Sequence, residues 1–377
     1  MQYPNRFLDL GVSGEEIKAR GEQIFQTIFY GSEEERFYHP VDPDMGYMED
    51  TGNHDARTEG MSYGMMMCVQ TDHQEEFDRI WKWTKTYMLL KKGPNKGYFC
   101  WSNGLDGKKN AQGPAPDGEE YFAMALIFAS RRWGDKEGIF DYMKEAGYIL
   151  HNMISKPDNW IKGANMFDRK NHLIRFVPGI GWSDPSYHLP HFYELFGQYA
   201  YPEDREFYLQ AAKASREYLH IACHPQTGLS SEYAHFDGTP VHPDEIRWSA
   251  GERHDYYYSD AYRTIINIAL DHVWFGKDEW QKEEGEKFLK FYCETLGKDK
   301  WDSILEIDGT IVEGKVLHPV AVIAANATAS LLCDNENAMY ALKKFWDTPL
   351  RTGDRRYYDN CLYFLAYLML SGSYRIW

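Results

Sequence analysis

The segment YSDAYRTIINIALDHVW, residues 258–274, carries the pattern that decides the fold. From Tyr258 onward, apolar and small side chains recur at i, i+3, i+4, i+7 and i+8, which predicts a helix with one wide buried face. The segment that follows it, DEWQKEEGEKFLKFYC at 278–293, is amphipathic and highly charged, which is typical of an exposed helix. The two segments therefore predict a buried helix paired with an exposed one.

The same alternation runs along the chain. Charged segments such as EEFDRIWKWTKTYMLL (75–90) alternate with nearly uncharged ones such as MSYGMMMCV (61–69) and CLYFLAYLML (361–370). A helix that is apolar on every side is buried. The periodicity predicts twelve helices, over residues 14–29, 60–70, 75–91, 118–133, 138–154, 185–199, 203–221, 258–274, 277–297, 320–333, 335–347 and 354–371.

The connections between these helices alternate in length. Links from a buried helix to the next exposed one are short, over 71–74, 134–137, 200–202, 275–276 and 334. The opposite links are mostly long, over 30–59, 92–117, 155–184, 222–257 and 298–319, and the fourth could include a small hairpin. Short links favour antiparallel helical hairpins. We therefore predict an all-α fold, an (α/α)6 barrel in one domain over 1–377, with its long loops on one face.

Composition narrows the class of partner. The 377 residues carry 41 basic and 57 acidic side chains, a net charge of −16, which disfavours nucleic acid and anionic membranes as partners. The sequence starts without a basic region followed by an apolar run, so we expect no signal peptide and a cytoplasmic location. The six cysteines are scattered and predict free buried thiols.

Aromatic side chains make up 16% of the chain, with 12 Trp, 28 Tyr and 20 Phe. A large aromatic core accounts for many of them. The surplus also suits a cleft in which flat rings stack on sugars.

Ionisable residues stand where the predicted inner helices begin. They are Glu59, Asp117, Asp184, Asp260, His318 and Asp354. Each one alone fits an ordinary helix cap or a charge that favours the helix dipole. Caps need not converge, however, whereas a barrel would bring all of these residues to one mouth. The mouth is therefore the predicted functional face.

Glu59 and Asp260 have opposed surroundings. Glu59 lies between a polar, turn-rich stretch and the apolar run Met65–Met67, so burial is expected to raise its pKa and suit a general acid. Three tyrosines precede Asp260, and Arg263 follows it by one turn. A nearby guanidinium favours the ionised carboxylate that a base requires. Two carboxyls of this kind are what glycoside hydrolysis needs.

The chain resembles glycoside hydrolase family 8 in four segments that follow the family's order. The first is APDGEEYFAMALIFASRRW (115–133), which keeps the family's Asp117 but departs from its pattern at Pro116, Glu119 and Phe122. The others are TEGMSYG (58–64), DPSY (184–187) and YSDAYR (258–263). This resemblance implies the (α/α)6 barrel and inversion of anomeric configuration.

The resemblance also implies the catalytic roles. Glu59 would protonate the departing oxygen, and Asp260 would take a proton from the attacking water, which Tyr187 helps to hold. Asp117 would bind the sugar at the cleavage point. Acid and base are then both supplied by carboxyls, so we expect neither a metal nor another cofactor.

Within the family, the chain is most similar to the reducing-end xylose-releasing exo-oligoxylanases, through APDGEE and through LHPV (317–320). This similarity implies that xylose is released from the reducing end of β-1,4-xylo-oligosaccharides. It also implies that His318 closes the cleft one sugar beyond the cut, unless His318 is a helix-entry histidine bound to backbone. Trp101, in YFCWSNG (98–104), is expected to stack on sugar or to be core, and Arg263 to bind substrate.

Several alternatives stay open. An endo-acting xylanase or glucanase of the same family would share the acid and the base, and Glu252 and Asp255 are rival candidates for that base. A cytosolic sugar epimerase or isomerase on a similar barrel would depend on histidine pairs, and the HLPH segment (188–191) could also place two zinc ligands. A non-catalytic oligosaccharide-binding protein would need the aromatic residues alone.

Overall fold

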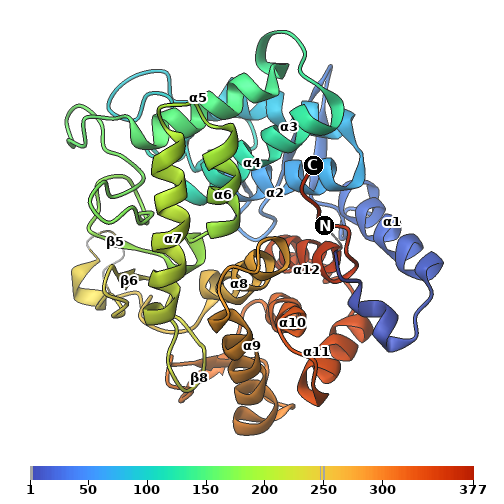
Figure 1. Ribbon diagram of the computed structural model, residues 1–377. Helices are drawn as coiled ribbons and strands as arrows, with labels where there is room; N and C mark the ends of the chain where they lie inside the picture. The colour runs from blue at the N-terminus through green and yellow to red at the C-terminus, as the bar shows by residue number, and fades with distance from the viewer. Residues whose placement is uncertain (1–2, 247, 249–250) are drawn as a thin grey trace.

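Two concentric rings of helices form the structure, a computed structural model that describes residues 3–246, 248 and 251–377 (Figure 1). The inner ring consists of α2 (Thr58–Thr71), α4 (Pro116–Trp133), α6 (Pro190–Tyr199), α8 (Arg263–Trp274), α10 (Pro319–Thr328) and α12 (Arg356–Leu370). Each of these helices contacts the next, and α12 contacts α2, so the ring closes on itself.

The outer ring surrounds the inner one. It consists of α1 (Gly14–Tyr30), α3 (Gln74–Trp83), α5 (Tyr142–Ile154), α7 (Arg205–Ala222), α9 (Trp280–Lys290) and α11 (Glu336–Asp347). Helices α3, α5, α7, α9 and α11 each pack against the inner helix that precedes them, and α1 packs against α12. The predicted (α/α)6 barrel is therefore confirmed, with twelve α-helices among the described residues.

Burial separates the two rings as the sequence predicts. Every residue of α12 is buried, and so are the first fourteen residues of α4, Pro116–Ala129. Outer helices bury one stripe only; α11, for example, buries Ala338, Ala341, Leu342 and Phe345. The apolar surface of the inner ring thus forms the core, and the charged segments face outward.

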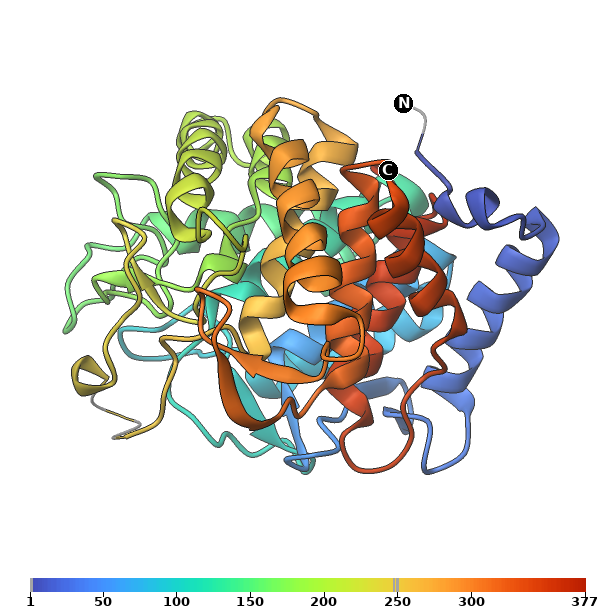
Figure 2. The same ribbon diagram turned by 90° about the horizontal axis from the view of Figure 1, so that it is seen from below.

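The long connections gather on one face, opposite the two chain ends (Figure 2). They contain four antiparallel pairs of short strands, which are β1 (Tyr38–Val41) with β2 (Met45–Met48), β3 (Asp55–Arg57) with β4 (Ser102–Gly104), β5 (Trp182–Ser183) with β6 (Ala234–His235), and β7 (Ser303–Leu305) with β8 (Ile311–Lys315). The hairpin expected within 222–257 is present, since Val241 N–H donates to the Tyr233 carbonyl at 3.0 Å. The other strands were not predicted, because two to five residues are too few to show an alternating pattern.

Six predicted helices change their geometry at one end; the one over 138–154 begins with the 3-10 turn Gly138–Phe140, and the one over 320–333 ends in the 3-10 turn Ala329–Leu331. The helix predicted over 75–91 ends at Trp83 and continues as a π-helical stretch, and the one over 277–297 does the same after Lys290. Those predicted over 185–199 and 258–274 begin with short 3-10 turns, Pro185–Tyr187 and Ser259–Tyr262. These turns place Tyr187 and Asp260 at the barrel mouth, just before the regular helices begin.

One continuous apolar core extends from Phe7 to Tyr374. It supports a single domain, which stays a prediction. All six cysteines are buried and unpaired, as predicted. In the part of the chain that the structure describes, every helix is too short or too polar to cross a membrane.

Candidate active site

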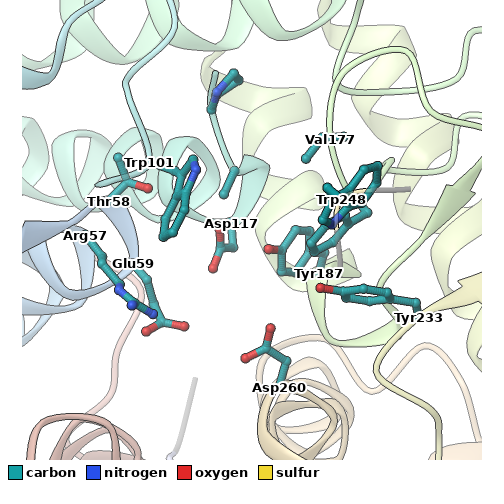
Figure 3. Close-up of a pocket in the computed structure, with 13 residues that line it drawn as sticks. Arg57, Thr58, Glu59, Trp101, Asp117, Val177, Tyr187, Tyr233, Trp248 and Asp260 are labelled. Atoms are coloured by element: carbon teal, nitrogen blue, oxygen red, sulfur yellow. The ribbon is translucent and has the colours of Figure 1, made fainter. Parts of the chain in front are cut away.

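A cavity of about 560 Å³ opens at the mouth of the inner ring, among the long loops (Figure 3). Its lining residues are Arg57, Thr58, Glu59, Trp101, Pro114, Ala115, Asp117, Phe176, Val177, Tyr187, Tyr233, Trp248 and Asp260. The structure therefore brings together Trp101 and the four residues that the sequence predicts as catalytic. They come from α2, α4, two 3-10 turns and one loop.

Arg263, the first residue of α8, holds three carboxylates of this site together. Its Nη1 donates to Glu59 Oε2 at 2.9 Å and to Asp117 Oδ2 at 3.1 Å. Its Nη2 lies 3.4 Å from Asp260 Oδ1. The side chain is buried behind the residues that line the cavity. The expectation that Arg263 binds substrate stays a prediction; in this structure the Arg263 guanidinium contacts the protein's own acids.

Glu59 has the environment of a proton donor. Burial raises its pKa to about 7, the carboxylates of Asp117 and Asp260 raise it as well, and Arg263 lowers it. The Tyr357 hydroxyl donates to Glu59 Oε1 at 2.9 Å and also lowers the pKa. The carboxyl thus keeps its proton in weakly acidic solution, which a general acid requires.

Burial also raises the pKa of two neighbouring acids. Burial raises the pKa of Asp117 to about 6, against the lowering effect of Arg263. Burial raises the pKa of Asp184 well above its usual value, and Asp184 Oδ1 accepts the Ser186 N–H at 2.7 Å. Protons on these groups reduce the repulsion among the acids around one guanidinium.

Asp260 is held by its backbone. Its N–H donates to Glu232 Oε1 at 3.2 Å. The preceding Ser259 adopts a left-handed φ of 39°, and its carbonyl accepts the Tyr358 hydroxyl at 3.0 Å. These contacts fix the turn, while the Asp260 side chain remains 30% exposed and faces Glu59 across the cavity (Figure 3).

The contacts of Glu59 and Asp260 with Arg263 set an upper limit on the separation of their carboxyl groups. Their carboxyl groups contact neighbouring nitrogens of the Arg263 guanidinium, at 2.9 Å and 3.4 Å. Two contacts of this length keep the carboxyls closer than about 9.5 Å, the upper limit for inverting enzymes. The Tyr187 ring lies beside the same guanidinium, 5.5 Å from its carbon, and its hydroxyl points into the space that Asp117 and Asp260 border (Figure 3).

Aromatic side chains form the opposite walls of the cavity. Trp101 is 39% exposed, and the Arg57 guanidinium lies 5.4 Å from its ring. It is therefore available for stacking rather than part of the core. On the other side, Trp248 is 56% exposed and stacks on Trp182 with 5.7 Å between ring centroids.

A second, smaller cavity of about 310 Å³ lies on the other side of the acid and the base. It shares Arg57, Glu59 and Asp260 with the larger one and is otherwise lined by Asp50, Asn53, Ser259, Leu317, His318, Arg355, Tyr357 and Tyr358. The two carboxyls thus stand between two spaces of unequal size. His318 belongs to the smaller space, and its Nδ1 contacts the Asp359 carboxylate at 3.1 Å, so it is held by a side chain rather than by backbone.

Other sequence candidates lie outside the site. Asp354 is exposed and stands two residues before α12 begins, and its backbone carbonyl accepts the Thr51 hydroxyl at 2.8 Å. Glu252 is 73% exposed, and Asp255 pairs with Arg253 at 2.8 Å.

The HLPH histidines face packing partners. Both ring nitrogens of His188 contact serine hydroxyls at 2.9 Å, those of Ser183 and Ser215. His191 packs edge-on against Trp274. Among the described residues, no group of three or more His, Cys, Asp or Glu side chains is arranged to hold a metal ion.

Sequence reasoning missed several residues at the site, among them Tyr357, Tyr358, Glu232 and Trp248. The two tyrosines belong to the apolar segment of α12, where they are indistinguishable from core. Glu232 is a polar residue in a long loop, and only the tertiary fold brings it to Asp260. Trp248 could have been predicted in the same way as Trp101, because it is also a tryptophan on a long loop.

Comparison with known proteins identifies the family. The model for "Glycosyl hydrolases family 8" matches residues 43–372. The chain belongs to glycosyl hydrolase family 8. It is thus a glycoside hydrolase of an inverting family.

Three relatives within this family cover essentially the whole chain. The reducing-end xylose-releasing exo-oligoxylanase of Paenibacillus barcinonensis is 50% identical over 375 residues, which make 100% of this chain and 97% of that protein. The enzyme of the same name from Halalkalibacterium halodurans is also 50% identical, over 100% of this chain and 95% of its own. A crystal structure of a reducing-end xylose-releasing exo-oligoxylanase superposes with a TM-score of 0.95, at 51% identity and covering 100% of this chain and 96% of that one.

Proposed function

We propose that this glycosyl hydrolase family 8 protein releases xylose from the reducing end of β-1,4-xylo-oligosaccharides, with inversion. The observation that carries the proposal is the unequal division of the site. Glu59 and Asp260 border both a large aromatic cavity and a small one that reaches Leu317 and His318. A cut at the two carboxyls leaves room for a longer fragment on one side and a short one on the other.

Similarity supports the same activity. The relatives at 50% identity are exo-oligoxylanases by name, whereas Endoglucanase 2 of Ruminiclostridium josui is 25% identical over 85% of this chain and 65% of its own length. An endo-acting enzyme is therefore the weaker alternative. A sugar epimerase has no support at this site, where the facing groups are carboxyls and not a histidine pair.

In the proposed reaction, Glu59 donates its proton to the glycosidic oxygen, and the bond to the anomeric carbon breaks. Asp260 takes a proton from a water on the opposite face of the sugar, and the resulting hydroxyl bonds to that carbon. Tyr187 and Asp260 hold this water, and Asp117 binds hydroxyls of the sugar at the cleavage point. His318 binds the departing xylose, while Trp101 and Trp248 stack on the longer fragment.

We also propose a cytoplasmic location. All six thiols are unpaired, which suits a reducing compartment. A substrate of a few sugars is small enough to be imported before it is cut.

The test uses xylotetraose labelled at its reducing end, with product analysis by chromatography and anomeric NMR at early times. The expected products are labelled xylose and a xylotriose whose new reducing end is the α-anomer. Labelled xylobiose or longer labelled fragments would instead indicate internal cleavage. Glu59→Gln and Asp260→Asn should each lower kcat by about 10²–10⁴-fold, and a variant with near-normal kcat would remove that residue from its role.

A further inference from the structure

Asp359, in the first turn of α12, is a fully buried carboxylate that the proposed reaction does not use. Its Oδ1 accepts the Ala321 N–H at the start of α10, at 2.8 Å. Its Oδ2 is bound by the Arg351 guanidinium and lies 3.1 Å from His318 Nδ1. A buried charge needs such partners, because leaving it unpaired costs several kcal/mol.

This contact fixes the state of the His318 ring. A carboxylate can only accept, so the contact places a proton on Nδ1 and leaves Nε2 for a ligand. His318 lines the smaller cavity together with Glu59 and Asp260. The Tyr358 ring packs edge-on against His318 at 4.9 Å and limits its rotation. Asp359 thereby sets both the orientation and the tautomer of the ring.

Arg351 holds the chain next to His318. Besides binding Asp359, its Nη1 donates to the Leu317 carbonyl at 2.6 Å. The side chain of Asn360 fixes the Arg351 backbone through two hydrogen bonds of 2.8 Å, one to its N–H and one to its carbonyl. Leu317 and His318 are thus tied to α12 through both side chain and backbone.

We propose that Asp359 and Arg351 are positioning residues that hold Leu317 and His318 as the end wall of the smaller cavity. They thereby limit that side of the cut to one sugar. This inference rests on the proposed function, because it explains what keeps the wall in place.

Labelled xylotetraose tests the inference through two variants, Asp359→Asn and Arg351→Met. Each should release labelled xylobiose in addition to labelled xylose, and raise KM for xylotriose about tenfold, the loss expected for one charge-assisted hydrogen bond. Arg351 is 26% exposed in its side chain, so its replacement should fold even if the Asp359 variant does not. Matched controls are Asp347→Asn and Arg131→Met, both at exposed positions, which should keep labelled xylose as the sole labelled product.

A purely structural role is distinguished by a double-mutant cycle. If Asp359 acts through His318, Asp359→Asn should not change the cut position further in a His318→Ala background. Additive changes, or single variants with wild-type melting temperature, wild-type KM and labelled xylose only, would overturn the inference.

The ring itself gives a readout that is independent of activity. ¹⁵N NMR of His318, assigned by comparison with His318→Ala, should show the proton on Nδ1 in the wild type. In Asp359→Asn the amide can donate to Nδ1, and the proton should move to Nε2. A wild-type ring protonated on Nε2 alone would contradict the inference. Failure of the wild type to release labelled xylose would instead contradict the proposed function.

Discussion

At the scale of the residue, burial of Glu59 gives it the pKa of a proton donor and makes it costly to ionise. Its pKa is raised from 4.5 to about 7, so the folded state favours the neutral form. This contribution to stability is present below pH 4.5 and is lost as the pH rises through about 7. The folded protein is therefore less stable at alkaline pH, because Glu59 is then ionised in a buried position.

Glu59→Gln should therefore stabilise the protein while removing activity. At pH 8 we expect the free energy of unfolding to rise by up to about 3 kcal/mol, because the glutamine amide stands in for the protonated carboxyl. At pH 4.5 the difference should nearly vanish. Denaturant unfolding at the two pH values measures it, with Glu22→Gln on the exposed side of α1 as control. An equal difference in the free energy of unfolding at both pH values would contradict the raised pKa of Glu59.

Tyr357→Phe should move the basic limb of the pH profile of kcat/KM to higher pH. The Tyr357 hydroxyl favours the charged form of Glu59, so its removal raises the pKa of Glu59 further above 7. Tyr358→Phe is the control, since that hydroxyl donates to the Ser259 carbonyl. A limb that stays in place or moves to lower pH would show that Glu59 is not the group that titrates.

Residues of the site differ in how much the sequence revealed of them. Glu59, Asp117 and Asp260 stand at the beginnings of inner helices, where a motif and a change from polar to apolar sequence coincide. Asp359 has no such mark, because it lies within α12, and Asp354 was preferred for its place before the helix. Asp359 is buried, and its place beside His318 comes from the packing of α12 against α10, which the sequence alone does not show.

At the scale of the element, α2 and α4 meet through a position that only glycine fits. A Cβ on Gly118 would lie 2.4 Å from Thr58 Cβ, next to the catalytic candidates Glu59 and Asp117. The close approach brings these two acids to one guanidinium. Helix propensity alone would favour alanine here, so packing outweighs propensity.

Gly118→Ala should therefore destabilise the protein by about 1–3 kcal/mol and lower kcat as Asp117 is displaced. Thermal unfolding and steady-state kinetics measure the two effects. Gly14→Ala, at the start of α1, meets no atom within 4 Å and should change neither. Wild-type stability and kcat in Gly118→Ala would contradict this prediction. They would show that α2 and α4 can move apart without displacing Glu59 and Asp117.

The sequence predicted the helices, because their apolar residues recur with a regular period. The buried–exposed alternation located the twelve helices, yet it extended two of them through their π-helical ends and merged four others with 3-10 turns. Two of those 3-10 turns carry Tyr187 and Asp260. Asp260 thus lies where the helical period breaks, and its backbone there is held by Glu232 from a distant segment.

At the scale of the whole molecule, the end of the chain closes onto the inner ring. Gln70, near the end of α2, donates to the Arg375 carbonyl at 2.8 Å and accepts from the Arg375 N–H and the Trp377 indole, each at 3.0 Å. The Arg132 guanidinium of α4 lies 3.8 Å from the Trp377 ring. Residues 375–377 thus tie α12 to α2 and α4 on the face opposite the cavity.

Gln70→Leu should lower the free energy of unfolding by about 1–3 kcal/mol, since it leaves the part-buried Arg375 N–H and Trp377 indole without their acceptor. Activity at low temperature should stay near wild type, because the bonds lie far from the mouth. Gln198→Leu on α6, whose amide makes one 3.4 Å bond, should cost less. Equal melting temperatures for the two variants would show that the terminal contacts do not hold the ring.

The complete burial of α12 bears on how this barrel can change over evolution. An amphipathic helix has an exposed side on which substitutions have little effect. Helix α12 has no exposed side from Arg356 to Leu370. One inserted or deleted residue would rotate everything beyond it by about 100° and misplace Tyr357, Asp359 or the core behind them. A saturation mutagenesis scan should therefore show intolerance along all of α12, without the 3.6-residue rhythm that α11 would display. We therefore expect new specificities to arise in the loops around the mouth rather than on α12.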